Sequence, residues 1–145
     1  MLILDRNKNI KFNIIGYEFP AIKPLTKDFD YDANWLELEI IYCDENIKKT
    51  YIDPCLLTCE FSDLVNALQQ IINNGENSWE SNFIEPCLSI RITKIDKFIN
   101  FVFSFVYDVT DAEVSKIEVA AKWTMKEAKD KVRELKDMEL KFPIR

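Results

Sequence analysis

Apolar and polar residues alternate over several stretches of the chain, and this period of two is typical of strands with one buried face. The clearest stretch is residues 34–43, in which every second residue from Leu36 is apolar. The opposite side of the same stretch carries Trp35, Glu37 and Glu39. The pattern predicts a strand with one face for a core and the other for water or a binding partner.

The same reasoning predicts a sheet around that strand. Further strands are predicted at residues 10–19, 48–52, 86–95, 98–107 and 113–121. Short connections join the last three, so we expect an antiparallel meander. Residues 98–107 are apolar on both sides, which predicts a central position.

Two helices are predicted from apolar residues at intervals of three and four. The first covers residues 59–73, with Thr58 as its N-cap and Asn74-Gly75 as a left-handed stop. The second begins after Thr124, because Thr124 and Glu127 have the spacing of a capping box.

These elements predict an α+β fold, in which a two-layer, mainly antiparallel sheet of five to six strands carries both helices on one face. With 145 residues we expect a single domain covering residues 1–145. The other face of the sheet is expected to stay open. It would carry Trp35, Glu37, Glu39, Arg91, Thr93, Lys116 and Glu118.

The net charge of -6 is unevenly distributed along the chain. Residues 122–145 carry eight Lys/Arg and five Asp/Glu, which gives a net charge of +3. Residues 1–121 carry the remaining eleven Lys/Arg and twenty Asp/Glu, which gives -9. An acidic surface repels phosphate backbones and attracts basic proteins, so a basic protein is the expected partner and nucleic acid is not. Solubility alone would also explain the acidity.

The chain has no apolar run long enough for a signal peptide or a membrane span, so we expect a cytoplasmic protein with no membrane partner. Its cysteines, Cys43, Cys55, Cys59 and Cys87, suit reduced thiols in that compartment. Their spacing differs from the two close pairs of a structural zinc site. We therefore expect neither a metal nor a cofactor.

Few residues suited to catalysis are present. The absence of histidine excludes histidine-dependent triads, and two distant glycines exclude a phosphate-binding loop. Glu37 and Glu39 have the separation of paired glycosidase carboxylates, but acids two apart on a strand are usually solvated. The loop acids Asp28, Asp30 and Asp32 lack the glycine and closing glutamate of a calcium loop. We expect no catalytic residues.

Three segments resemble the WapI-type immunity protein family of bacterial polymorphic and contact-dependent toxin systems. They are residues 32–36 (Asp-Ala-Asn-Trp-Leu), residues 83–88 and the tail at residues 140–145. The resemblance implies a small cytosolic protein that binds and neutralises the toxic domain of a cognate toxin, often a nuclease. It carries no catalytic residues over to this chain.

The candidate partner-binding residues, all from the acidic strand and the loop before it, are Asp28, Asp30, Asp32, Trp35, Glu37 and Glu39. Aromatic anchors and acidic side chains together suit recognition of a basic protein. The sequence leaves two other functions open, and it does not determine the oligomeric state. One is a structural module that self-associates, and the other is a small-ligand or carbohydrate binder that uses Trp35 as a stacking platform.

Overall fold

The computed structural model describes residues 1–5, 7–22, 29–109 and 114–145 of the chain. These residues form an α+β fold with two antiparallel sheets, which confirms the predicted class. Sheet A contains, in spatial order, β1 (Leu2–Asp5), β2 (Lys8–Tyr17), β3 (Trp35–Cys43) and β4 (Lys48–Leu57). Sheet B contains, in spatial order, β5 (Ser78–Glu80), β6 (Leu88–Ile95), β7 (Phe98–Val109) and β8 (Val114–Thr124). The helices are α1 (Tyr31–Asn34), α2 (Thr58–Ile72) and α3 (Met125–Lys141).

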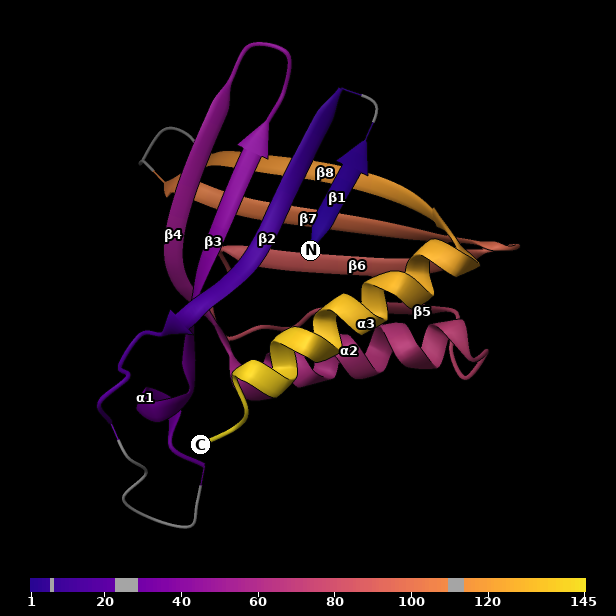
Figure 1. Cartoon of the computed structure of the whole chain (residues 1–145). Coiled ribbons are helices and arrows are strands. Elements are labelled where there is room, and N and C mark those ends of the chain that lie inside the picture. Colours follow the sequence, from indigo (N-terminus) through magenta and orange to yellow (C-terminus); the bar gives the residue numbers. More distant parts are fainter. Residues whose placement is uncertain (6, 23–28, 110–113) are drawn as a thin grey trace.

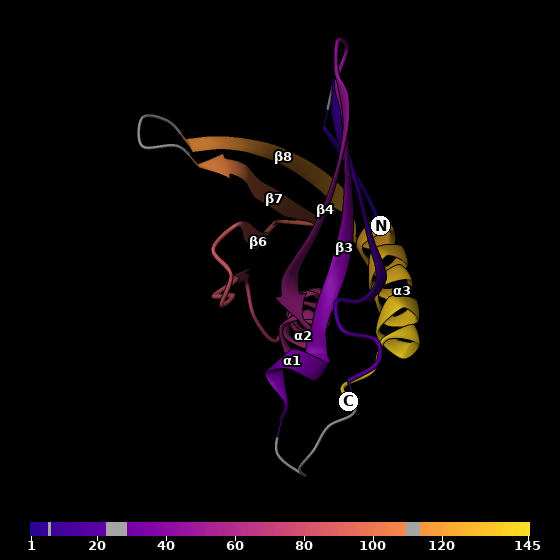
Figure 2. The same cartoon turned by 90° about the vertical axis from the view of Figure 1, so that its left-hand side faces the viewer.

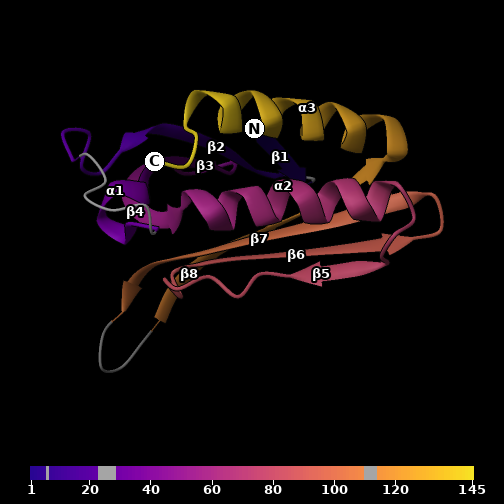
Figure 3. The same ribbon diagram turned by 90° about the horizontal axis from the view of Figure 1, so that it is seen from below.

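The two sheets lie one in front of the other, and their strands cross at a steep angle (Figure 1). A view turned by 90° shows sheet A edge-on, with sheet B extending to one side of it (Figure 2). The edges β1 and β8 lie together. From below, α2 lies between α3 and strands β5–β7, and the two long helices run antiparallel (Figure 3). The helices therefore close the side where the sheets diverge.

The strands were predicted to form one sheet, and in this respect the structure differs. The chain leaves sheet A at the end of β4 and enters α2 directly, so the strands that follow start a second sheet. Each sheet keeps one outward face, and the residues expected on one open face are divided between them. Trp35, Glu37 and Glu39 belong to sheet A. Arg91, Thr93, Lys116 and Glu118 belong to sheet B.

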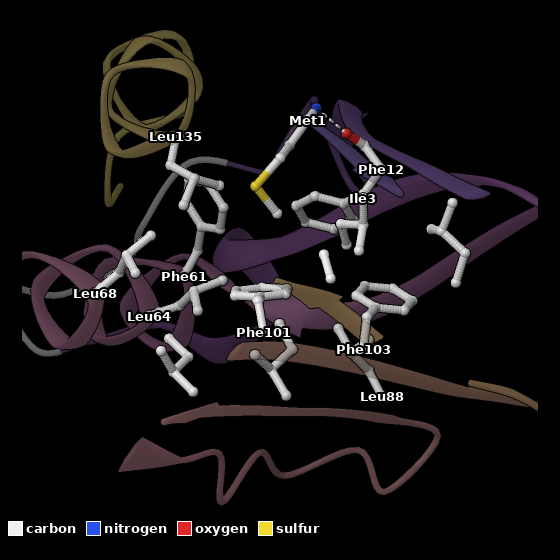
Figure 4. Close-up of a cluster of buried hydrophobic side chains, with 14 of the residues drawn as sticks. Met1, Ile3, Phe12, Phe61, Leu64, Leu68, Leu88, Phe101, Phe103 and Leu135 are labelled. Atoms are coloured by element: carbon white, nitrogen blue, oxygen red, sulfur yellow. Dashed lines mark hydrogen bonds between the residues drawn. The ribbon is translucent and has the colours of Figure 1, made fainter. Parts of the chain in front are cut away.

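Both sheets and both long helices contribute to one hydrophobic core (Figure 4). Phe12 on β2 lies at its centre, with ring centroids 5.9 Å from Phe103 on β7 and 6.3 Å from Phe61 on α2. Leu135 brings α3 into the same cluster. Contacts of this kind hold the two sheets together, because no hydrogen-bonded ladder joins the sheets within the residues that the structure describes.

Three short elements were not predicted, namely β1, β5 and α1. They have three or four residues each, which is too short for a period of two or 3.6 to be recognised. The antiparallel meander was predicted correctly, with β7 between β6 and β8. Its phenylalanines at 101, 103 and 105 are buried in the core.

The helix ends follow the predicted chemistry with one exception. Thr124 and Glu127 form the capping box, since Glu127 Oε2 accepts from the Thr124 N–H at 2.7 Å and Thr124 Oγ1 accepts from the Glu127 N–H at 3.3 Å. The left-handed stop of α2 lies at Asn74, whose φ is 64°. The prediction of Thr58 as N-cap is wrong, because Leu57 occupies that position and Thr58 is already helical.

Replacing Thr124 by alanine is expected to lower the free energy of unfolding by about 1 kcal/mol, because α3 loses its N-cap acceptor. The two hydrogen bonds from Thr124 hold the pKa of Glu127 below its usual range in the folded protein. The ionised carboxylate therefore stabilises the fold at a pH above its pKa in the unfolded chain. This contribution is lost as the pH falls through its lower pKa in the folded protein. Urea unfolding of wild type and Thr124→Ala at neutral and acid pH measures both effects. An unchanged unfolding midpoint at neutral pH would contradict the assignment.

Candidate functional site

The acidic strand lies in the interior of sheet A. β3 pairs with β2 on one side and β4 on the other, so Glu37 and Glu39 lie in the middle of the outward face and not at an edge. Both side chains are half-buried, while the alternate residues Leu36, Leu38 and Ile40 are fully buried in the core. The predicted division of this strand into a core face and an outward face is confirmed.

Apolar side chains flank these two acids. Glu39 lies opposite Asn13 on β2 and opposite Ile52 on β4. Asn13 Nδ2 donates a hydrogen bond to Glu39 Oε2 at 3.1 Å, which fixes the carboxylate on the sheet. Ile52 is 58% exposed and Ile15, on β2, is 45% exposed. The outward face of sheet A thus combines negative charge with accessible apolar surface.

The loop acids differ from one another in position. Asp28 lies outside the described residues. Asp30 caps the short helix α1, because its carboxylate accepts from the Ala33 N–H at 3.3 Å. Asp32 is exposed in the first turn of α1, where a negative charge is favourable. Of the described pair, Asp32 is therefore the side chain more available to a partner.

Glu18 is an acidic residue that the sequence reasoning did not include. Its pKa is raised by burial and then by repulsion from Asp32, Glu37 and Asp53. Glu18 directly follows β2, and its backbone N–H donates to the carbonyl of Trp35 at the start of β3, so it lies beside the strand that carries Glu37. We use the term acidic patch for Glu18, Asp32, Glu37 and Glu39. These residues extend from the end of β2 and from α1 along the outward face of β3.

Trp35 lies at the junction of α1 and β3, next to the acidic patch. The residue is half-buried, and its backbone carbonyl accepts from the Glu18 N–H at 3.0 Å. It therefore links the backbone that carries Glu18 to the strand that carries Glu37. In the chain, Trp35 follows the helix of Asp32 and begins the strand of Glu37 and Glu39.

Asn34 holds this end of the molecule together and was also missed as a key residue. The side chain is fully buried. Its amide nitrogen donates to the carbonyls of Asp30 at 2.8 Å and Arg145 at 2.9 Å. Its carbonyl oxygen accepts from the Arg145 N–H at 2.9 Å and from the Thr58 hydroxyl at 2.8 Å. Asn34 therefore joins α1, the start of α2 and the tail after α3.

Arg145 anchors the tail beside the acidic patch. Its guanidinium donates to the carbonyls of Ala33, Phe19 and Pro20, and it stacks over the ring of Tyr17 at 3.7 Å. The segment at residues 32–36 and the tail at residues 140–145, which are far apart in sequence, are thus joined in the structure. These contacts fix the backbone on which Asp32, Trp35 and Glu37 are mounted.

The outward face of sheet B has a different character. A cavity of about 370 Å³ lies over it, lined by residues that include Arg91, Ser104 and Glu118. Ser104 donates to Glu118 at 2.8 Å and Lys116 lies 3.6 Å from the same carboxylate, and together they hold the pKa of Glu118 below its usual range. The carboxylate of Glu118 on this face therefore has both a hydroxyl and an ammonium partner.

Comparison with protein families identifies the chain. A model of the WapI-like immunity protein family matches residues 1–143. The chain belongs to this family. Membership indicates a role in immunity to a toxin, in agreement with the resemblance seen in the sequence. No curated protein and no solved structure matched the chain. Within the described ranges, the helices of this WapI-like protein are too short or too polar to cross a membrane.

Proposed function

We propose that this protein binds the toxic domain of a cognate bacterial toxin and neutralises it with the acidic patch and Trp35. The observation that carries the proposal is the placement of Asp32 on α1 and of Glu37 and Glu39 on the outward face of β3, beside the exposed apolar side chains of Ile15 and Ile52. A basic partner would complement this concentration of negative charge. Family membership supports the choice of a toxin as that partner.

The proposed mechanism is occlusion. A nuclease toxin binds phosphates through lysines and arginines, and these are the groups that a dense set of carboxylates would engage. Trp35 and the exposed isoleucines, Ile15 and Ile52, would supply the apolar centre that gives such interfaces their affinity. The protein would act by covering the catalytic surface of the toxin, with no chemical step of its own.

The experiment that tests this function is a calorimetric titration against the toxin domain encoded by the neighbouring gene. We expect a one-to-one complex and loss of toxin activity at the same stoichiometry. A titration with no heat and no inhibition would remove the proposed function. Light scattering on the free protein addresses self-association, because assembly into a structural module would give a mass that rises with concentration.

Binding is expected to be fast and sensitive to salt. Charge complementarity raises association rates, and salt screens charges separated by more than about 10 Å at 0.1 M ionic strength. We expect the association rate constant to fall roughly tenfold or more between low and high salt, with a smaller change in the dissociation rate constant. Stopped-flow measurements over a series of salt concentrations test this. An association rate constant that salt leaves unchanged would contradict electrostatic steering.

A further inference from the structure

Two cysteines that are far apart in sequence meet at the edge of the core. Cys55 is on β4 of sheet A, and Cys87 precedes β6 of sheet B. The side chain of Asp53, two residues before Cys55 on the same strand, lies beside both thiols. One atom from each side chain, two sulfurs and a carboxylate oxygen, lies within 4.8 Å of both others.

We propose that Asp53, Cys55 and Cys87 form a binding site for a zinc ion. Zinc prefers tetrahedral sets of thiolate, imidazole and carboxylate ligands, with bonds of about 2.3 Å to sulfur and about 2.0–2.2 Å to oxygen. Ligand atoms around such an ion are therefore about 3.3–3.8 Å apart. The three atoms need only a small approach to reach this geometry.

The surroundings of the three side chains suit a bound ion. Cys55 is buried, which limits competition from water, while Asp53 and Cys87 are half-buried. Cys87 also lines the cavity over sheet B, which provides an entry path and space for a fourth ligand. We expect water in that fourth position, since the set supplies three protein ligands.

The position in the fold gives the ion a structural role. β1 and β8 bring the two sheets together at one edge. β4 lies at the opposite edge of sheet A, and its Cys55 meets Cys87 in the segment that joins β5 and β6 of sheet B. A zinc ion there would link the two sheets away from the β1 edge. Because it binds the folded chain, it would stabilise that state.

Cobalt serves as the spectroscopic probe, added to reduced, metal-free protein. We expect thiolate-to-cobalt charge-transfer absorption that saturates at one ion per chain and disappears when zinc is added. Zinc at one hundred times its dissociation constant is expected to raise the melting temperature by roughly 5–10 °C. Both measurements use the isolated protein, so their result is separate from the test of toxin binding.

The variant Cys87→Ser should lose the absorption band and the thermal shift, and Asp53→Asn should weaken both. Cys59→Ser is the matched control, because this half-buried thiol lies outside the cluster, and it should behave as wild type. Cys87 is half-buried, so its variant is expected to fold even if a change at buried Cys55 prevents folding. Three results would overturn the proposal. They are absence of the absorption band in the wild-type protein, persistence of the band in Cys87→Ser, and a reduced protein that binds no cobalt but forms a Cys55–Cys87 disulfide on oxidation.

Discussion

Replacing Asn34 by alanine is expected to lower the free energy of unfolding by about 3 kcal/mol and the melting temperature by roughly 10 °C. The asparagine side chain is fully buried and takes part in four hydrogen bonds. Alanine leaves the Thr58 hydroxyl and backbone groups of Asp30 and Arg145 without these partners. A buried polar group that loses its partner costs about 1–3 kcal/mol, so several such losses give the expected total.

Urea unfolding of Asn34→Ala measures this loss. The matched control is Asn66→Ala, which makes the same chemical change at an exposed position of α2 and should alter the free energy of unfolding by less than about 0.5 kcal/mol. If Asn34→Ala unfolds at the wild-type midpoint, Asn34 does not join α1, α2 and the tail as described.

The double variant Glu37→Lys/Glu39→Lys is expected to weaken binding to the toxin domain by about 100-fold or more, because like charges placed opposite each other cost several kcal/mol. Both side chains lie on the outward face of the central strand β3, so the reversal leaves the core side of β3 unchanged. Isothermal titration calorimetry measures the change, and circular dichroism verifies that the variant is folded.

The control for this variant separates local contact from overall charge. Glu76→Lys/Glu80→Lys changes the net charge by the same amount at exposed positions at and just before β5 of sheet B. We expect it to slow association modestly and to change affinity by less than tenfold. Equal losses in the two double variants would mean that net charge, and not the acidic patch, controls binding.

Local features of this fold were predictable from the sequence. Strand and helix periods located the main elements, and the residues that cap α3 were recognised because capping uses fixed spacing. The outward position of Glu37 and Glu39 followed from alternation along a single strand. These inferences concern residues that are close along the chain, whose relative positions follow from their spacing in the sequence.

Contacts between distant segments were not predictable in the same way. The division into two sheets depends on how α2 redirects the chain after β4, and no local pattern encodes it. The sequence predicts only a strand at residues 10–19 around Glu18, and the place of this residue beside the strand of Glu37 appears only when β2 and β3 are paired. Asn34 and Arg145 are 111 residues apart, so their hydrogen bonds could not be inferred from spacing.

Hydroxyl-radical footprinting of the complex with the toxin domain tests the central claim most directly, since it reports the accessibility of individual side chains. The proposed occlusion by sheet A predicts that Trp35, Ile15 and Ile52 are oxidised more slowly in the complex than in the free protein. It also predicts unchanged oxidation of Trp79 on β5 and Tyr107 on β7. Protection of the sheet B residues with no protection of Trp35 and Ile52 would contradict it.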